Sequence, residues 1–203
     1  FNKNYKNLLN WSIKYSPDFW SSFWDFSEIK GKKSKKKIKR SKIFHKNLFL
    51  PGSKLNFGEN LLSKNTNEKA ITFVSENGYR EERSWKQLNI NVASLVQFFN
   101  EIKIVKSDRI AAYMPNCIET VEAFIATSSV GGIWSSCSPD FGVRGLVERF
   151  SQIKPKLLFI TDQYFYNGKQ INIIERLPEI LKLIPSIKNV VIINYPGKKF
   201  LKI

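Results

Sequence analysis

Three short polar segments follow apolar runs of the chain and hold the side chains best placed for chemistry. They are Pro115-Asn116, Ser138–Gly142 and the stretch 162–169. If the apolar runs are parallel strands, these segments lie at the carboxyl ends of the strands, where open α/β sheets bind ligands. None is glycine-rich enough to hold a phosphate group alone, and neither G-x-x-x-x-G-K-[ST] nor G-x-G-x-x-G occurs. The residues alone therefore predict an incomplete α/β ligand-binding domain.

The nucleophilic and metal-ligating residue types are too sparse to build a catalytic centre. Cys117 and Cys137 lack the neighbours of a zinc site, and we interpret them as buried thiols in a reducing cytoplasm. His45 has no carboxylate or Cys nearby to act with it. We therefore assign no catalytic residue and no metal ligand, and we expect a cytoplasmic protein.

The net charge of +16 is what a nucleic-acid or anion binder would carry, but the basic residues are mostly the wrong kind. Only 7 of the 33 are Arg, and the excess of Lys, Asn and Ile is typical of an AT-rich genome. The densest block, 30–42, has no interleaved aromatic residue for base stacking, and we expect a solvated loop there. Anion or nucleic-acid binding through 30–42 stays the non-catalytic alternative.

The N-terminal part predicts two helices and a wrapping loop. Tyr5, Leu8 and Ile13 have helical spacing within 3–15. Ser16 is then expected to cap a second helix, with Pro17 in its first position. That helix carries five aromatic residues, too many to leave exposed, so it is expected to dock onto a larger body. Segment 50–58, with its Pro and Gly, is expected to be a loop with turns.

From about residue 68 the pattern changes to strands and helices in alternation. Asn77-Gly78 predicts a hairpin turn with positive φ at both positions, and Ser84 with Gln87 predicts a capping box. The β-α-β rhythm that follows predicts an α/β fold with a partial, open, mostly parallel sheet and flanking helices. No apolar run approaches the roughly 20 residues of a membrane helix, so no membrane partner is expected. The expected strands are 70–75, 79–83, 109–114, 133–137, 156–161 and 187–193, and the expected helices are 84–101, 118–130, 143–153 and 171–184, the last interrupted at Pro178.

Four segments resemble the acetoacetyl-CoA synthetases, a branch of the adenylate-forming superfamily that includes the acetyl-CoA synthetases. Their order and spacing are similar to those of the family, and the fourth, GGIWSSCSPDFG, is the most specific to this branch. The segments are 17–20 with 24–26, 51–62, 107–116, and 131–142 continued by Arg149-Phe150.

The resemblance implies a two-step reaction: a carboxylate attacks the α-phosphate of ATP, and the thiol of CoA then displaces AMP. The implied partners are acetoacetate, ATP and CoA, with Mg²⁺ as cofactor and the remainder of the enzyme's own chain beside this part. In the family the phosphate loop lies beyond the position of Ile203, so we expect residues 1–203 to be an N-terminal portion that is inactive alone. The implied organisation is an N-terminal segment over 1–65 and the first part of an AMP-binding domain over 66–203.

The resemblance also implies binding residues on the CoA side. The turn that contains Asp140, Phe141 and Gly142 corresponds to a wall of the pantetheine tunnel. Tyr166 and Lys169 correspond to two Arg that approach the CoA 3′-phosphate in acetyl-CoA synthetases. Lys can supply a point charge and Tyr a hydroxyl, but the bidentate geometry of Arg is lost. Another short acyl acid as substrate is the alternative within the same fold.

Overall fold

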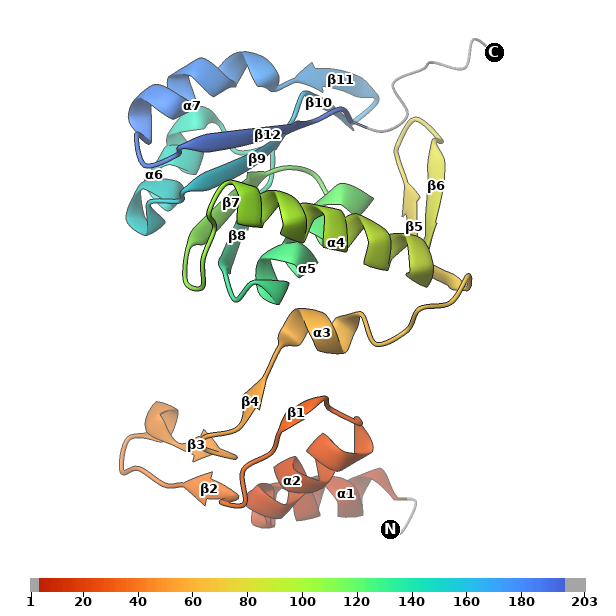
Figure 1. Ribbon diagram of the computed structural model, residues 1–203, viewed down its shortest axis with the longest axis vertical. Coiled ribbons are helices and arrows are strands. Elements are labelled where there is room, and N and C mark those ends of the chain that lie inside the picture. Colours follow the sequence, from red (N-terminus) through yellow and green to blue (C-terminus); the bar gives the residue numbers. More distant parts are fainter. Residues whose placement is uncertain (1–3, 196–203) are drawn as a thin grey trace. The chain divides into compact units, whose positions relative to one another are not determined.

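The computed structural model describes residues 4–195, which fall into two compact units that divide between residues 60 and 61. Each unit is described by itself (Figure 1). The predicted domain boundary at 65/66 stays a prediction.

The first unit begins with two short helices, α1 (Tyr5–Lys14) and α2 (Ser16–Phe26). Asn4 caps α1 by accepting a hydrogen bond from the Lys6 N–H at 2.9 Å. The predicted cap at Ser16 is wrong: Tyr15 stands at the N-cap of α2 without a side-chain hydrogen bond, and Ser16 is already helical. Of the five aromatic residues of α2, only Trp24 is buried in this unit.

The lysine block and the segment after it are more ordered than a solvated loop. Lys33 Nζ lies 2.6 Å from Asp25 Oδ2, and Lys37 Nζ lies 2.5 Å from Asp18 Oδ1. Two carboxylates of α2 thus offset part of the repulsion between the lysines, on which the prediction of a solvated loop was based. The segment 50–58 likewise contains a strand and the start of a helix. The elements are β1 (Gly31–Lys32) paired with β4 (Lys54–Leu55), β2 (Ile38–Lys39) paired with β3 (Leu48–Phe49), the 3₁₀ turn η1 (Phe44–Lys46) and helix α3 (Phe57–Leu61).

The second unit starts with a hairpin and a long helix. The hairpin pairs β5 (Lys69–Val74) with β6 (Arg80–Ser84), and the Gly78 N–H donates to the Ser75 carbonyl at 3.0 Å to close its turn. The prediction of positive φ at both turn positions was wrong: of Asn77 and Gly78, only Gly78 has a positive φ, at +82°. Ser84 caps α4 (Trp85–Glu101) by accepting from the Gln87 N–H at 3.1 Å. The Gln87 side chain donates to Asn91 rather than back to Ser84, so only half of the capping box forms.

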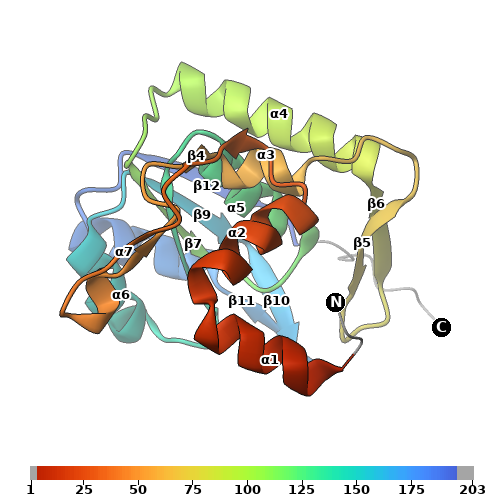
Figure 2. The ribbon, with the colours of Figure 1, turned by 90° about the horizontal axis from the view of Figure 1, so that it is seen from below.

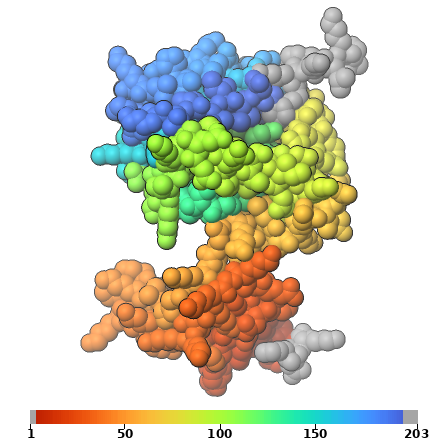
Figure 3. Space-filling view, viewed as in Figure 1, coloured from red at the N-terminus to blue at the C-terminus, as the bar shows by residue number. Residues whose placement is uncertain are grey.

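A four-stranded parallel sheet in the order β12-β9-β7-β8 forms the centre of this unit. Helices α4 and α5 cover one face and α6 and α7 the other (Figures 1 and 2), and α4 spans the face seen in Figure 3. The predicted α/β class with a parallel sheet is confirmed. The remaining bounds are β7 (Arg109–Tyr113), α5 (Ile118–Ser129), β8 (Ile133–Cys137), α6 (Val143–Ile153), β9 (Leu157–Thr161), α7 (Leu177–Leu183) and β12 (Asn189–Ile193).

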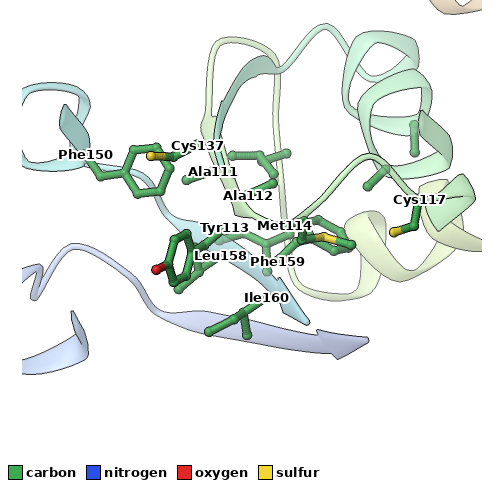
Figure 4. Close-up of a cluster of buried hydrophobic side chains, with 14 of the residues drawn as sticks. Ala111, Ala112, Tyr113, Met114, Cys117, Cys137, Phe150, Leu158, Phe159 and Ile160 are labelled. Carbon is green, nitrogen blue, oxygen red and sulfur yellow. The ribbon is translucent and has the colours of Figure 1, made fainter. Parts of the chain in front are cut away.

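The core lies on both faces of β7 and β9. All five residues of β9 and the segment Ile110–Tyr113 of β7 are buried, as a central parallel strand requires. Phe159 of β9 contacts the rings of Phe99 and Trp134, with centroids 6.1 and 6.2 Å away. Figure 4 shows part of this cluster, including both cysteines. Their predicted burial is confirmed.

The predicted helix over 171–184 is wrong in its first part. Residues 163–172 form a second hairpin, β10 (Gln163–Tyr166) and β11 (Lys169–Asn172), closed by Asn167-Gly168 with both φ angles positive. The 3₁₀ turn η2 (Ile174–Arg176) leads from it into α7. Pro178 lies in the first turn of α7, where no backbone donor is needed, and it does not interrupt the helix.

Candidate functional site at the carboxyl ends of the strands

The strand order creates a crevice between the loops that follow β7 and β9. The chain leaves β7 toward β8 on one side and returns to β9 on the other, which makes the β7/β9 boundary the switch point of the sheet. A pocket of about 430 Å³ opens there. Its lining comprises Phe73, Val74, Ser75 and Glu76 from the first hairpin, Met114, Pro115, Asn116 and Thr120 after β7, Ser136, Cys137, Ser138, Pro139 and Asp140 after β8, Tyr164, Phe165 and Tyr166 of β10, and Tyr195.

Asp140 is the predicted site residue that the structure places most firmly in this pocket. Its Oδ1 accepts a hydrogen bond from the Tyr164 hydroxyl at 2.9 Å, and its Oδ2 accepts one from the Ser138 hydroxyl at 2.7 Å. Burial and the hydrogen bond to Asp140 raise the pKa of Tyr164 to about 12. Tyr164 therefore stays protonated at neutral pH and links the 138–142 turn to the second hairpin as a donor.

Phe141 and Gly142 do not line the pocket, although they follow Asp140 directly. The Phe141 ring is 40% exposed, and Arg149 packs on it. Gly142 stands at the N-cap of α6. Of the predicted trio, only Asp140 therefore lines the pocket.

Tyr166 and Lys169 face each other across the turn of the second hairpin, since they form its last residue pair. Tyr166 lines the pocket, while Lys169 is exposed and lies outside the lining. The Gly168 N–H donates to Glu76 Oε2 at 3.4 Å, so the tips of the two hairpins meet at the rim. The sequence placed these residues in a loop, and the structure instead fixes them by β pairing.

Two residues that the sequence did not single out hold the 138–142 turn. The hydroxyl of Tyr113, a fully buried side chain of β7, lies within donating distance of two carbonyls, that of Pro139 at 3.0 Å and that of Phe141 at 2.5 Å. Arg176 Nη1 donates to the Tyr113 hydroxyl and, at 3.1 Å, to the Pro139 carbonyl. The only prior signal was the position of Tyr113 at the end of a buried strand, because nothing in the sequence ties Arg176 to a turn 37 positions earlier.

The pocket offers hydroxyl groups and the carboxylates of Glu76 and Asp140, but no activated nucleophile. Burial raises the pKa of the Cys137 thiol and of the Tyr195 phenol, which donates to or accepts from Ser75 at 3.1 Å. Neutral hydroxyls and a neutral thiol can bind and orient a polar ligand, but they cannot attack it. The arrangement is that of a binding wall.

Among the described residues, no group of three His, Cys, Asp or Glu side chains gathers closely enough to hold a metal ion. None of the helices between residues 4 and 195 is long and apolar enough to cross a bilayer.

Comparisons with known proteins agree with this reading of the fold. The model of the AMP-binding enzyme family matches residues 61–201. Acetoacetyl-CoA synthetase of Xenopus tropicalis is 42% identical over 196 residues, which are 95% of this chain and 29% of the relative. The solved structure of acetoacetyl-CoA synthetase from Streptomyces lividans superimposes with a TM-score of 0.90 at 29% identity, over 98% of this chain and 31% of that one.

A relative with a different name shares the same segment. Malonamoyl-CoA synthetase of Penicillium aethiopicum is 33% identical over 200 residues, which are 95% of this chain and 28% of the relative. The chain therefore spans less than a third of the length of each of these relatives.

Proposed function

Because the chain belongs to the AMP-binding enzyme family, we propose that it is part of an acid–thiol ligase that makes acetoacetyl-CoA. The overall reaction converts acetoacetate, ATP and CoA into acetoacetyl-CoA, AMP and pyrophosphate. The acetoacetate carboxylate attacks the α-phosphorus and pyrophosphate leaves; the CoA sulfur then attacks the acyl carbon and AMP leaves. The observation that carries this proposal is the 42% identity to an acetoacetyl-CoA synthetase along 95% of the chain.

We assign this chain a role in holding CoA rather than in adenylation. Asp140, Phe141 and Gly142 form the turn beside which the pantetheine arm passes, and Tyr166 and Lys169 approach the 3′-phosphate. The support is geometric: Asp140 and Tyr166 line one pocket at the switch point of the sheet, and Lys169 pairs with Tyr166 at its rim. The intact enzyme would use Mg²⁺ with ATP, but the described residues offer no three-ligand group for it, so no step is assigned to a metal here.

The reaction is tested with the protein that carries this chain at the length of its relatives. We expect acetoacetate-dependent exchange of pyrophosphate into ATP without CoA, and thioester formation when CoA is added. Exchange that does not depend on any short acyl acid would overturn the proposal.

The role of Lys169 is tested with two forms of the thiol substrate. Lys169→Ala should raise the KM for CoA and leave the KM for 3′-dephospho-CoA unchanged, because only CoA carries the phosphate that the charge would contact. Lys182→Ala, an exposed Lys of α7, is the matched control. An equal effect of Lys169→Ala on both thiols would contradict the assignment.

A second candidate substrate is another short acyl acid, which the similarity to a malonamoyl-CoA synthetase favours. Comparing kcat/KM for acetoacetate with that for other short acids in the exchange assay separates the two. The anion- or nucleic-acid-binding alternative predicts DNA or RNA binding that weakens steeply with salt and is lost when lysines of 30–42 become Ser. A cytoplasmic location is proposed on the two buried free cysteines.

A further inference from the structure

Arg176 directs its hydrogen bonds at the backbone of another segment instead of at a carboxylate. Nη1 donates to the hydroxyl of Tyr113, to the Pro139 carbonyl at 3.1 Å and to the Phe141 carbonyl at 3.4 Å. Within residues 4–195 it forms no ion pair. A half-buried guanidinium whose donors meet only neutral oxygens makes charge-assisted bonds to them, and these are stronger than neutral ones.

Tyr113 relays this contact from the core of the sheet. Burial raises the pKa of Tyr113, which keeps its hydroxyl protonated despite the opposing effect of the nearby Arg176. The hydroxyl accepts from Arg176 and donates to the Pro139 or Phe141 carbonyl. Figure 4 shows this hydroxyl pointing away from Met114 and Cys117. The two carbonyls are thus held by a buried strand and by the residue that precedes α7.

The carbonyls of Pro139 and Phe141 lie on either side of Asp140, whose side chain lines the pocket. Asp140 lies between Pro139 and Phe141 in the chain, and its carboxylate accepts from Tyr164 and Ser138 while lining the pocket. The Pro139 carbonyl belongs to the peptide plane that precedes Asp140, and the Phe141 carbonyl belongs to the plane that follows the next residue. Holding both limits how the backbone on either side of Asp140 can rotate, and hence where its carboxylate points.

We propose that Arg176 is a positioning residue for CoA. Together with Tyr113, it holds the 139–141 backbone in the conformation that presents Asp140 to the pantetheine arm. The inference rests on the proposed function. Arg176 is assigned no role in adenylation. Its contacts go to the turn assigned to CoA and to Tyr113, the buried residue that also holds this turn.

The test separates the two half-reactions of the protein at the length of its relatives. Arg176→Ala should raise the KM for CoA about tenfold, as expected for a lost charge-assisted hydrogen bond, and leave acetoacetate-dependent pyrophosphate exchange unchanged. Arg176→Lys, which keeps the charge but not the geometry of the guanidinium, should show a smaller rise. Arg144→Ala is the matched control, because Arg144 lies on α6 with its side chain 93% exposed and forms an ion pair with Glu148 on the same helix.

Tyr113→Phe provides a second variant that keeps the buried ring and removes only the hydroxyl. It should raise the KM for CoA in the same direction, and the double variant with Arg176→Ala should cost less than the two single effects combined. Exchange that falls in parallel with thioester formation, or an unchanged KM for CoA, would overturn the positioning role alone. If the unsubstituted protein shows no exchange, the proposed function fails and this inference fails with it.

Discussion

The guanidinium of Arg149 lies over the ring of Phe141, 4.3 Å from the ring centroid. Arg149 lies on α6, the helix after the turn, and its charge faces this aromatic ring. The turn is therefore held at the Phe141 side chain by α6 and at its carbonyl by Tyr113. Three elements that are separate in the chain, namely β7, α6 and the η2–α7 junction, converge on one turn.

This ring contact predicts a measurable stability difference. Arg149→Gln should lower the free energy of unfolding by about 0.5–1 kcal/mol, the usual range for a partly exposed cation–π contact. Urea denaturation measures it. Arg144→Gln on the same helix removes only an exposed ion pair and should cost no more than about 0.5 kcal/mol. Equal losses in the two variants would count against a specific ring contact.

Gly132 is expected to tolerate no side chain. A Cβ there would lie 3.0 Å from Thr127 Cγ2 and 3.2 Å from the Thr127 carbonyl oxygen, and Thr127 is fully buried. Gly132→Ala should therefore cost about 1–3 kcal/mol in unfolding free energy. Gly145→Ala is the control with the opposite sign: its Cβ would meet Phe141 at an ordinary 3.4 Å, and removing a helical Gly should stabilise by about 0.5–1 kcal/mol.

Asp108 should make stability depend on pH in the acid range. Burial alone would raise its pKa, but hydrogen bonds from Lys156 Nζ and the Val105 N–H, each 2.9 Å long, hold the pKa below its usual value. A lowered folded-state pKa means that this stabilisation is present above the pKa of the unfolded chain and is lost as pH falls through the folded value. Asp108→Asn should thus cost about 1 kcal/mol at pH 7. In urea titrations the difference from the unsubstituted chain should shrink toward zero in acid; a constant difference would contradict this account.

The Cys117 thiol should be unreactive in the folded chain. Burial raises its pKa to about 11, so at pH 8 only about one thiol in a thousand is ionised. In a Cys137→Ser background, reaction of the remaining thiol with an aromatic disulfide reagent should be slow and should accelerate sharply in denaturant. Fast reaction without denaturant would show that the β7–α5 junction opens readily.

The buried strands could be predicted because their apolar runs are stable only in the interior of the protein. The helix from Val143 to Ile153 and the strand from Ile133 to Cys137 agree with prediction at both ends, since polar or glycine residues bound each run. For α5 a helix was predicted, but not which of its faces is buried. Val121 is 37% exposed, and the small residues Ala123 and Ala126 pack inward, because their volume fits the close approach of helix and sheet.

The second hairpin was missed although its signal was present. Asn167-Gly168 is the same turn dipeptide as Asn77-Gly78, but its flanking residues merge with the helical spacing that continues toward α7. Arg176 could not be predicted as part of the site at all. Its role depends on a tertiary contact between the η2–α7 junction and the turn after β8. Local sequence patterns do not show which distant segments come into contact.

The central position of β7 has a consequence for the time course of folding. β7 can pair first with β8 across the intervening α5, whereas β9 must wait for α6 to cross the sheet, and β12 can dock only on a completed β9. Loop closure favours the shorter connection, so assembly is expected to run outward from β7. Substitutions in β7 should slow refolding, and substitutions in β12 should mainly accelerate unfolding.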